Sequence, residues 1–262
     1  MTAQLSPIDT AKYVAGRQAV TFVEDGMKLG LGTGSTAAFM VRALAERVQA
    51  EGLRVTCVAT SQRTEDLARN LGLEVVGLDE ARWLDLTIDG ADEFDPEFNL
   101  IKGGGAALLR EKIVASASDR MVVITDASKD VATLGAFPLP VEIVPFGWQA
   151  TRTMIEDLLV SFDVLSHDCV LRRDGDRPVL TDNGNHILDL HLARIADPRL
   201  LALRLNQVPG VVENGLFIDI CDCVVIGHGD GRVEVRERAA GAVRQGAAGL
   251  PGADNVFGTG SN

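Results

Sequence analysis

The sequence is short of basic residues and of long apolar runs, and each shortage excludes a class of protein. Its 262 residues carry 25 Lys and Arg against 37 Asp and Glu, a formal net charge of −12. Nucleic acids and anionic membranes select basic surfaces, so we expect neither as a partner. No apolar run approaches the roughly 20 residues that a membrane-spanning helix needs. The acid excess also argues, at first sight, against an anionic small substrate.

Cysteine is scarce as well, and its spacing fits neither a disulfide framework nor a zinc site. The sequence contains Cys57, Cys169, Cys221 and Cys223, mostly within apolar runs. Only one residue separates Cys221 from Cys223, and no second pair of this kind accompanies them, so we expect no metal. Such thiols indicate a reducing compartment. Residues 1–9 lack a basic start followed by an apolar stretch, so we expect no secretory signal and a cytoplasmic protein.

The first half of the chain alternates apolar strands with helices. Near-continuous apolar strands between helices are typical of a parallel sheet covered on both faces. We therefore predict an α/β fold with a Rossmann-like open, mostly parallel sheet. The expected strands are 27–31, 54–59, 73–77, 84–89 and 121–125. The expected helices are 9–25, one that begins with Ser35 or Thr36 as N-cap, 63–70 and 105–117.

From about Leu139 the order changes to strand–helix–strand–strand–helix–strand, which suggests a smaller α+β, ferredoxin-like domain with an antiparallel sheet. We predict an α/β catalytic domain of residues 1–138 and 214–230, with the run Cys221–Gly227 returning to its sheet. Residues 139–213 would form the small domain, with short strands expected at 168–171, 179–181 and 187–190. Residues 239–262 contain six Gly and six Ala with little periodicity, and we predict a mostly disordered tail.

A glycine-rich turn follows the first strand and predicts an anion site. In Gly30-Leu-Gly-Thr-Gly-Ser-Thr36, backbone N–H groups and the positive end of a helix dipole can face an anion. The third glycine of a dinucleotide fingerprint is replaced by Ser35, and the lysine of a P-loop is missing. We interpret Thr33, Gly34, Ser35 and Thr36 as a cradle for a phosphate or hydroxyl group. A plain tight turn is the alternative.

A second motif, Asp89-Gly-Ala-Asp92-Glu93, directly follows an apolar strand. Ligands of open α/β sheets collect beyond the carboxyl ends of strands, where carboxylates can accept hydrogen bonds from sugar hydroxyls. We therefore expect Asp89, Gly90, Ala91 and Asp92 to contact a ligand. A solvated acidic turn or a metal site is the alternative.

A third motif, Lys102-Gly-Gly-Gly105, leads into the helix that carries Glu111. The glycines leave backbone amides free to approach a ligand closely. Glu111 lies on an apolar helix face, where a carboxylate rarely sits without a partner or a purpose. Partial desolvation would raise its pKa and suit a general base, whereas a salt bridge to Arg110, Lys112 or another cation is the alternative.

Two further lysines complete the set of candidates. Lys129 ends the run Thr125-Asp-Ala-Ser-Lys129, just after a strand, and could bring positive charge to the same edge of the sheet. Lys12, early in the first helix, is a weaker candidate. Four strand ends thus present a phosphate cradle, aspartates, a desolvated glutamate and lysines to one rim.

In this order and spacing, the motifs resemble the type A family of ribose-5-phosphate isomerases, over roughly residues 9–230. The resemblance rests on Gly30–Ala37, Asp89–Glu93, Ile101–Ala107 with Arg110–Lys112, Asp126–Lys129, Phe137–Glu142 and Thr181–Asn185. It implies the reversible conversion of D-ribose 5-phosphate to D-ribulose 5-phosphate in the pentose phosphate pathway. It also implies that Glu111 accepts the proton and that no cofactor is needed.

The resemblance further implies which segments bind the substrate and that the chain forms a homodimer or homotetramer. The implied binding segments are Thr33–Thr36, Asp89–Asp92, Lys102–Gly105, Lys129 and Lys12. The chain departs from the family pattern in a charged insertion around Arg172–Arg177 and in its tail, and we expect neither to touch the motif residues. The net charge of −12 does not disfavour a phosphorylated sugar as substrate. The binding of a phosphate group depends on the local electrostatic field, which comes from the amides at a helix start and from lysines.

The chemistry agrees with this resemblance. Isomerisation through an enediolate needs one base on one face and donors for the developing oxyanion. The amides of Gly103–Gly105 and a lysine are candidate donors, and Asp89 or Asp92 would move the hydroxyl proton and open the furanose ring. One alternative is another sugar-phosphate enzyme, such as an amino-sugar-phosphate deaminase. The other is a sugar-phosphate sensor of a transcription regulator, for whose DNA-binding helices residues 1–26 leave no room.

Overall fold

The computed structural model describes residues 5–238 and 243–247, and its largest sheet has eight strands in the order β17-β16-β15-β7-β4-β1-β2-β3. The six strands from β15 to β3 are parallel, and β16 and β17 add an antiparallel edge. The parallel strands are β1 (Lys28–Leu31), β2 (Thr56–Ala59), β3 (Glu74–Val75), β4 (Leu86–Gly90), β7 (Met121–Asp126) and β15 (Cys223–Gly227). The edge strands are β16 (Arg232–Glu237) and β17 (Val243–Ala247).

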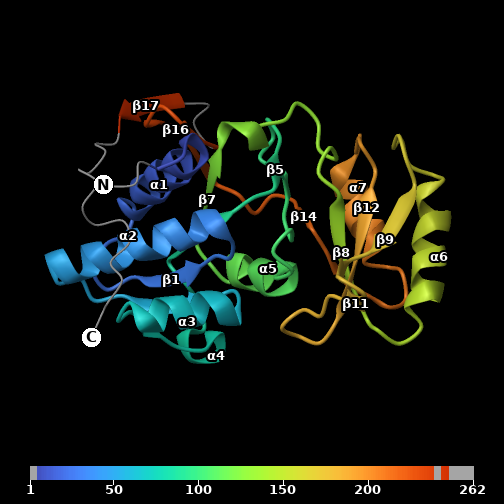
Figure 1. Cartoon of the computed structure of the whole chain (residues 1–262), viewed down its shortest axis with the longest axis horizontal. Coiled ribbons are helices and arrows are strands. Elements are labelled where there is room, and N and C mark those ends of the chain that lie inside the picture. The colour runs from blue at the N-terminus through green and yellow to red at the C-terminus, as the bar shows by residue number, and fades with distance from the viewer. Residues whose placement is uncertain (1–4, 239–242, 248–262) are drawn as a thin grey trace.

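Helices cover both faces of this sheet, as predicted (Figure 1). One face packs against α1 (Pro7–Val20), α2 (Ser35–Glu51) and α3 (Gln62–Asn70). The other packs against α4 (Leu78–Ala81) and α5 (Leu108–Ser116). The apolar strand residues are buried because both faces are covered, which explains their near-continuous apolar runs. In the described residues, no helix has the length and apolar character to cross a membrane.

A second sheet of four antiparallel strands, in the order β13-β8-β12-β9, lies beside the first (Figure 1). Its strands are β8 (Leu139–Ile143), β9 (Asp168–Leu171), β12 (His186–His191) and β13 (Val211–Asn214). Helices α6 (Trp148–Leu159) and α7 (Pro198–Leu205) bury Ile155 and Leu201 against it. The predicted smaller antiparallel sheet is therefore present, and Cys223–Gly227 does return to the main sheet. The division into domains at the stated residues stays a prediction.

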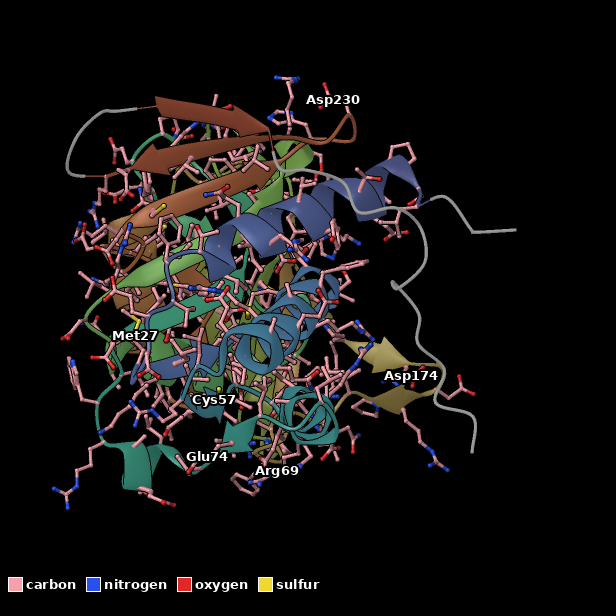
Figure 2. The ribbon with its side chains drawn as sticks, turned by 90° about the vertical axis from the view of Figure 1, so that its left-hand side faces the viewer. Met27, Cys57, Arg69, Glu74, Asp174 and Asp230 are labelled. Atoms are coloured by element: carbon pink, nitrogen blue, oxygen red, sulfur yellow. The ribbon has the colours of Figure 1, made fainter. Side chains whose placement is uncertain are left out.

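Several short elements were not foreseen. A three-stranded sheet joins β5 (Glu93–Phe94), β6 (Leu100–Ile101) and β14 (Leu216–Phe217), and β10 (Arg173–Asp174) pairs with β11 (Arg177–Pro178). A single 3-10 turn, η1, spans Ala127–Lys129. Figure 2 shows Asp174 on the β10–β11 hairpin, at the edge of the molecule. Two-residue strands carry too little sequence to show a period, so only tertiary pairing reveals them.

Three sequence-based expectations are wrong. The N-cap of α2 is Gly34, with φ 109°, and not Ser35 or Thr36, so no side chain caps this helix. The expected strand at 179–181 does not form, because Thr181 instead closes a turn by accepting at its carbonyl the amide of Gly184. Val243–Ala247, within the expected disordered tail, pairs with β16. The rest of that expectation, residues 239–242 and 248–262, lies outside the described residues.

The close approach of α1 to β15 generates a test of this packing. A Cβ atom on Gly227 would lie 1.9 Å from the carbonyl oxygen of Ala11 in α1. Backbone cannot yield as a flexible side chain does, so Gly227→Ala should lower the free energy of unfolding by at least the roughly 1–3 kcal/mol typical of overpacking. Urea denaturation measures it. Gly77→Ala is the control, because a Cβ there meets nothing within 4 Å; equal midpoints for the two variants would contradict the packing.

Candidate functional site

A cavity of about 310 Å³ opens at the carboxyl ends of β1, β4 and β7, which are neighbours in the sheet. It brings together every predicted site residue except Asp89. The predicted residues that line it are Lys12, Thr33, Gly34, Ser35, Thr36, Gly90, Ala91, Asp92, Lys102, Gly103, Gly104, Gly105, Glu111 and Lys129. Sequence reasoning had not chosen Ile8, Thr125, Asp126 and Ser128, which also line it. The polar run Thr125–Lys129 at the end of β7 gave a signal for the last three, whereas Ile8 gave none.

The glycine-rich turn is shaped by the carboxylate of Asp89. A Cβ on Gly32 would lie 2.0 Å from Asp89 Oδ1, so only glycine fits there. The same oxygen accepts hydrogen bonds from the amides of Thr33 (3.0 Å) and Gly90 (2.7 Å). Because Gly34 has no side chain to cap α2, the first amides of that helix stay available at the cavity. This arrangement suits an anion.

The ammonium group of Lys102 is buried between two carboxylates. Its Nζ lies 3.0 Å from Asp89 Oδ2 and 3.3 Å from Glu111 Oε1, and it donates to the carbonyl of Gly90 at 2.5 Å. The three side chains are 2%, 0% and 5% exposed. The ring of Phe217, 5.4 Å away, completes the surroundings of the cation. Glu111 Oε2 has no hydrogen-bond partner among the described residues, so one oxygen of this carboxylate accepts no hydrogen bond from the protein there.

Burial and neighbouring charges raise the pKa values of all three groups in this cluster, by different balances of the two causes. Burial, followed by the negative charge of Asp89, raises the pKa of Glu111 to about 8. Burial also raises the pKa of Asp89, against the opposing effect of Lys102. Burial lowers the pKa of Lys102, but the two carboxylates more than offset it, so its pKa lies above the ordinary value. The lysine therefore stays charged, and Glu111 exchanges a proton near neutral pH.

Of the cations considered as partners for Glu111, Arg110 and Lys112 bind elsewhere, whereas another cation, Lys102, does pair with it. Arg110 donates to the side chain of Asn183 at 3.0 Å and to the carbonyl of Asp182 at 3.1 Å. On the other side of Glu111, Lys112 donates to Glu213 at 2.8 Å and to the carbonyl of Asn214 at 2.6 Å. Both neighbours thus tie α5 to the segments of the second sheet, and Glu111 alone of the three faces the cavity.

The expected contact of Asp89 with a ligand stays a prediction, and the structure places this residue behind the wall of the cavity. Its side chain is fully buried and does not line the cavity, because Lys102 and the glycine-rich turn cover it. Asp92 does line the cavity, and its Oδ2 accepts the amide of Gly104 at 2.8 Å. In this structure the two aspartates therefore have separate tasks. Asp89 holds a turn and a lysine, and Asp92 faces the cavity.

The expectation that the charged insertion avoids the motif residues is wrong for Arg172. Its guanidinium group donates to the carbonyl oxygens of Gly103 at 2.8 Å and Gly104 at 3.2 Å. A side chain from the second sheet therefore reaches the glycine loop of the site.

The site agrees with what comparisons with known proteins found. The profile of the family described as Ribose 5-phosphate isomerase A (phosphoriboisomerase A) matches residues 56–231. A relative from Cereibacter sphaeroides, named Ribose-5-phosphate isomerase A, is 72% identical over 240 residues, 92% of this chain and 96% of its own length. A relative of the same name from Ruegeria pomeroyi is 63% identical, and the match covers 98% of each chain.

Solved structures are similar over most of the chain. Ribose 5-phosphate isomerase A from Methanocaldococcus jannaschii has a TM-score of 0.80 and 38% identity, covering 87% of this chain and 98% of its own. A D-ribose-5-phosphate isomerase in complex with phospho-erythronic acid has a TM-score of 0.81 and 39% identity, covering 88% and 99%.

The raised pKa of Glu111 predicts how stability depends on pH. Between its ordinary value of 4.5 and about 8, the folded protein keeps a proton on Glu111 that the unfolded chain has lost. The folded state then binds more protons, so stability falls as pH rises through this range. Glu111→Gln removes the effect, and its unfolding free energy should fall less than that of the wild type from about pH 5 to pH 8. Each pKa unit is worth roughly 1.4 kcal/mol.

Urea denaturation at a series of pH values measures this difference. Glu97→Gln, at an exposed position, is the control and should follow the wild-type curve. If Glu111→Gln also runs parallel to the wild type, its carboxyl has an ordinary pKa in the folded protein.

Proposed function

The chain belongs to the ribose 5-phosphate isomerase A family, and we propose that Glu111 moves the proton in its reaction. That reaction is the interconversion of D-ribose 5-phosphate and D-ribulose 5-phosphate, an isomerase step of the pentose phosphate pathway. Membership replaces the alternatives of a deaminase and of a sensor domain. The observation that carries the proposal is a buried carboxylate with one unpartnered oxygen, at the wall of a cavity.

The proton transfer follows from the state of Glu111. Ionised Glu111 takes the proton from C2 of the open-chain aldose, and the electrons of the C–H bond form the C1–C2 double bond of an enediolate. The π electrons of the C1 carbonyl move to O1 at the same time, which gives that oxygen its negative charge. The same carboxyl then returns the proton to C1, while the proton of the C2 hydroxyl moves to O1. A pKa near 8 makes Glu111 a stronger base than an ordinary carboxylate, with a usable ionised fraction near neutral pH.

Negative charge on the enediolate oxygen needs fixed positive partners. We assign Lys102 as such a partner, because Asp89 and the carbonyl of Gly90 hold its positive charge at the cavity. Fixed donors and charges of this kind cost no reorganisation at the moment of reaction. We assign Asp92, which lines the cavity, to the hydroxyl proton that moves in ring opening. Asp89 is a positioning residue for Lys102.

The phosphate group is proposed to bind at the other positive part of the cavity. This part of the cavity offers hydrogen-bond donors in the first amides of α2 and in the hydroxyls of Ser35 and Thr36. Lys12 and Lys129 add positive charge there. A relative in this family binds phospho-erythronic acid, a phosphorylated analogue. Binding of the remote phosphate can position the sugar at Glu111.

Two further proposals concern the setting of the enzyme. We propose that it works in the cytoplasm, which its four buried free thiols support. We propose that it forms a homodimer or homotetramer, which rests on the family resemblance.

Glu111→Gln tests the assignment of the base. The amide keeps the size of the side chain and cannot accept the proton, so kcat should fall by about 10²–10⁴-fold while KM changes little. The assay follows formation of ketopentose phosphate from D-ribose 5-phosphate. Glu97→Gln is the matched control and should keep the wild-type rate. Near-normal turnover in Glu111→Gln would remove this residue from its role.

Lys129→Met tests the phosphate position separately. The methionine keeps most of the apolar stem and removes the ammonium group, which lies 5.8 Å from the centre of the Phe137 ring. Hydrogen bonds to charged groups are worth roughly 1.5–3 kcal/mol, so KM should rise by about 10- to 100-fold with a smaller change in kcat. The same variant should be inhibited less by inorganic phosphate. A fall confined to kcat would instead place Lys129 at the reacting carbons.

A further inference from the structure

The side chain of Arg172 joins the second sheet to the glycine loop of the cavity. We propose that Arg172 is a positioning residue that aims the amide of Gly105 at the oxyanion of the enediolate. The inference rests on the proposed function, since it concerns a donor for that intermediate. It assigns a task to a residue that the sequence analysis placed in a charged insertion.

The guanidinium group of Arg172 donates hydrogen bonds to Asp189 on one side and to the glycine loop on the other. Asp189 in β12 accepts two hydrogen bonds from the guanidinium group, at 2.9 Å from Nε and 2.5 Å from Nη2. The remaining terminal nitrogen, Nη1, donates to the carbonyls of Gly103 and Gly104. The side chains of Arg172 and Asp189 are 16% and 18% exposed. The pair is thus mostly buried, and its planar fork has one orientation.

The direction of the amides follows from the planar trans peptide. In a trans peptide the N–H group points opposite to the carbonyl oxygen. The carbonyl of Gly103 faces Arg172, and the N–H of the same peptide, on Gly104, donates to Asp92 on the far side. The carbonyl of Gly104 also faces Arg172, so the N–H of Gly105 points toward the same side as Asp92. Gly105 and Asp92 both line the cavity.

The amide of Gly105 is available to a ligand. Among the described residues it donates to no backbone or side-chain acceptor, whereas the next amide, on Ala106, donates to the carbonyl of Gly103. The neighbouring peptide already serves Asp92. Gly105 therefore offers a free donor of this loop on the side of Asp92. The charged guanidinium group of Arg172, which donates to the carbonyl of Gly104, also polarises this peptide. The N–H of Gly105 is therefore a stronger donor.

The loop needs an external support of this kind. Three successive glycines have no side chains that pack, and their backbone dihedral angles are free to vary widely in the unfolded and unbound states. Gly103 has φ 106°, in the region that favours glycine, and Gly104 and Gly105 are exposed. Arg172 holds two carbonyls of this loop from the second sheet. Without it, only the bond from Gly104 to Asp92 and the turn at Ala106 fix the loop.

Kinetics of Arg172→Met and Arg172→Lys test the inference. Methionine keeps the stem without the fork, and lysine keeps the charge but supplies a single donor point. Loss of one oxyanion donor typically costs about 10²–10³-fold in kcat, so Arg172→Met should lose about 10- to 100-fold, because the amide remains but is no longer aimed. KM and the inhibition constant of inorganic phosphate should stay within about threefold. Arg172→Lys should recover part of kcat, and Asp189→Asn should lower it less than Arg172→Met.

Arg173→Met is the matched control. Arg173 is adjacent and exposed, and its guanidinium donates to the carbonyl of Asp176 within the β10–β11 hairpin, so this variant should keep the wild-type kcat. Circular dichroism and a thermal melt of each variant establish that the kinetics are measured on folded protein.

Three results would overturn the inference. A kcat for Arg172→Met within twofold of the wild type, with or without a lower melting temperature, would make its role structural only. A parallel rise in KM and in the phosphate inhibition constant at unchanged kcat would place Arg172 with the phosphate group. A wild-type chain that turns over no D-ribose 5-phosphate would refute the proposed function itself, and with it this inference; the first two results leave that function intact.

Discussion

The site depends on one buried cation. Lys102 is almost fully enclosed, and such a charge is tolerated only with partners that replace water. Asp89, Glu111 and the carbonyl of Gly90 supply them. Two carboxylates share a single ammonium group, so if both are ionised the cluster carries an excess negative charge away from water. Burial is the main physical reason that Glu111 holds its proton more tightly than an ordinary glutamate, and the negative charge of Asp89 adds to it.

Other buried carboxylates hold the surrounding motifs in place. Glu93 accepts the amides of Gly135 and Phe137 at 2.7 and 2.5 Å, which fixes the chain that enters the second sheet. Glu142 in β8 accepts from the hydroxyl of Thr181 and the amide group of Asn185, both at 2.9 Å.

The turn held by Glu142 reaches back to the main sheet. Asp182 in that turn accepts the amide of Gln62 at the start of α3 at 2.9 Å. Its backbone carbonyl accepts from Arg110, the neighbour of Glu111. Segments that look unrelated in the sequence are therefore linked into the frame that orients α5, and with it Glu111.

The sequence predicts a feature correctly where a residue type at a position has a single physical explanation. Gly32 is readable because close approach admits no side chain, and Glu111 because a carboxylate on an apolar face needs an explanation. Long apolar strands such as β7 were found because both of their faces are buried. These features are local, so the order of residues along the chain reveals them.

The features that sequence reasoning missed depend on contacts between distant segments. The burial of Asp89 behind Lys102 is set by a lysine 13 positions later, and nothing beside Asp89 in the chain signals it. Arg172 lies 69 residues from Gly103 in a stretch of charged residues that reads as a solvated loop. The N-cap expectation failed because Ser35 and Thr36 are common caps, whereas in the structure Gly34, with φ 109°, takes that position and leaves both residues inside the first turn of α2.

The net charge of −12 is compatible with an anionic substrate because the charges act at different distances. Exposed acids such as Asp25 and Asp163 are paired with arginines, and solvent charges beyond about 8 Å are largely screened at physiological ionic strength. The carboxylate of Asp89 lies outside the cavity, behind Lys102, and Glu111 retains one proton over much of the acidic range. The field at the proposed phosphate position is then set by Lys12, Lys129 and the uncapped start of α2, which are positive although the protein as a whole is not.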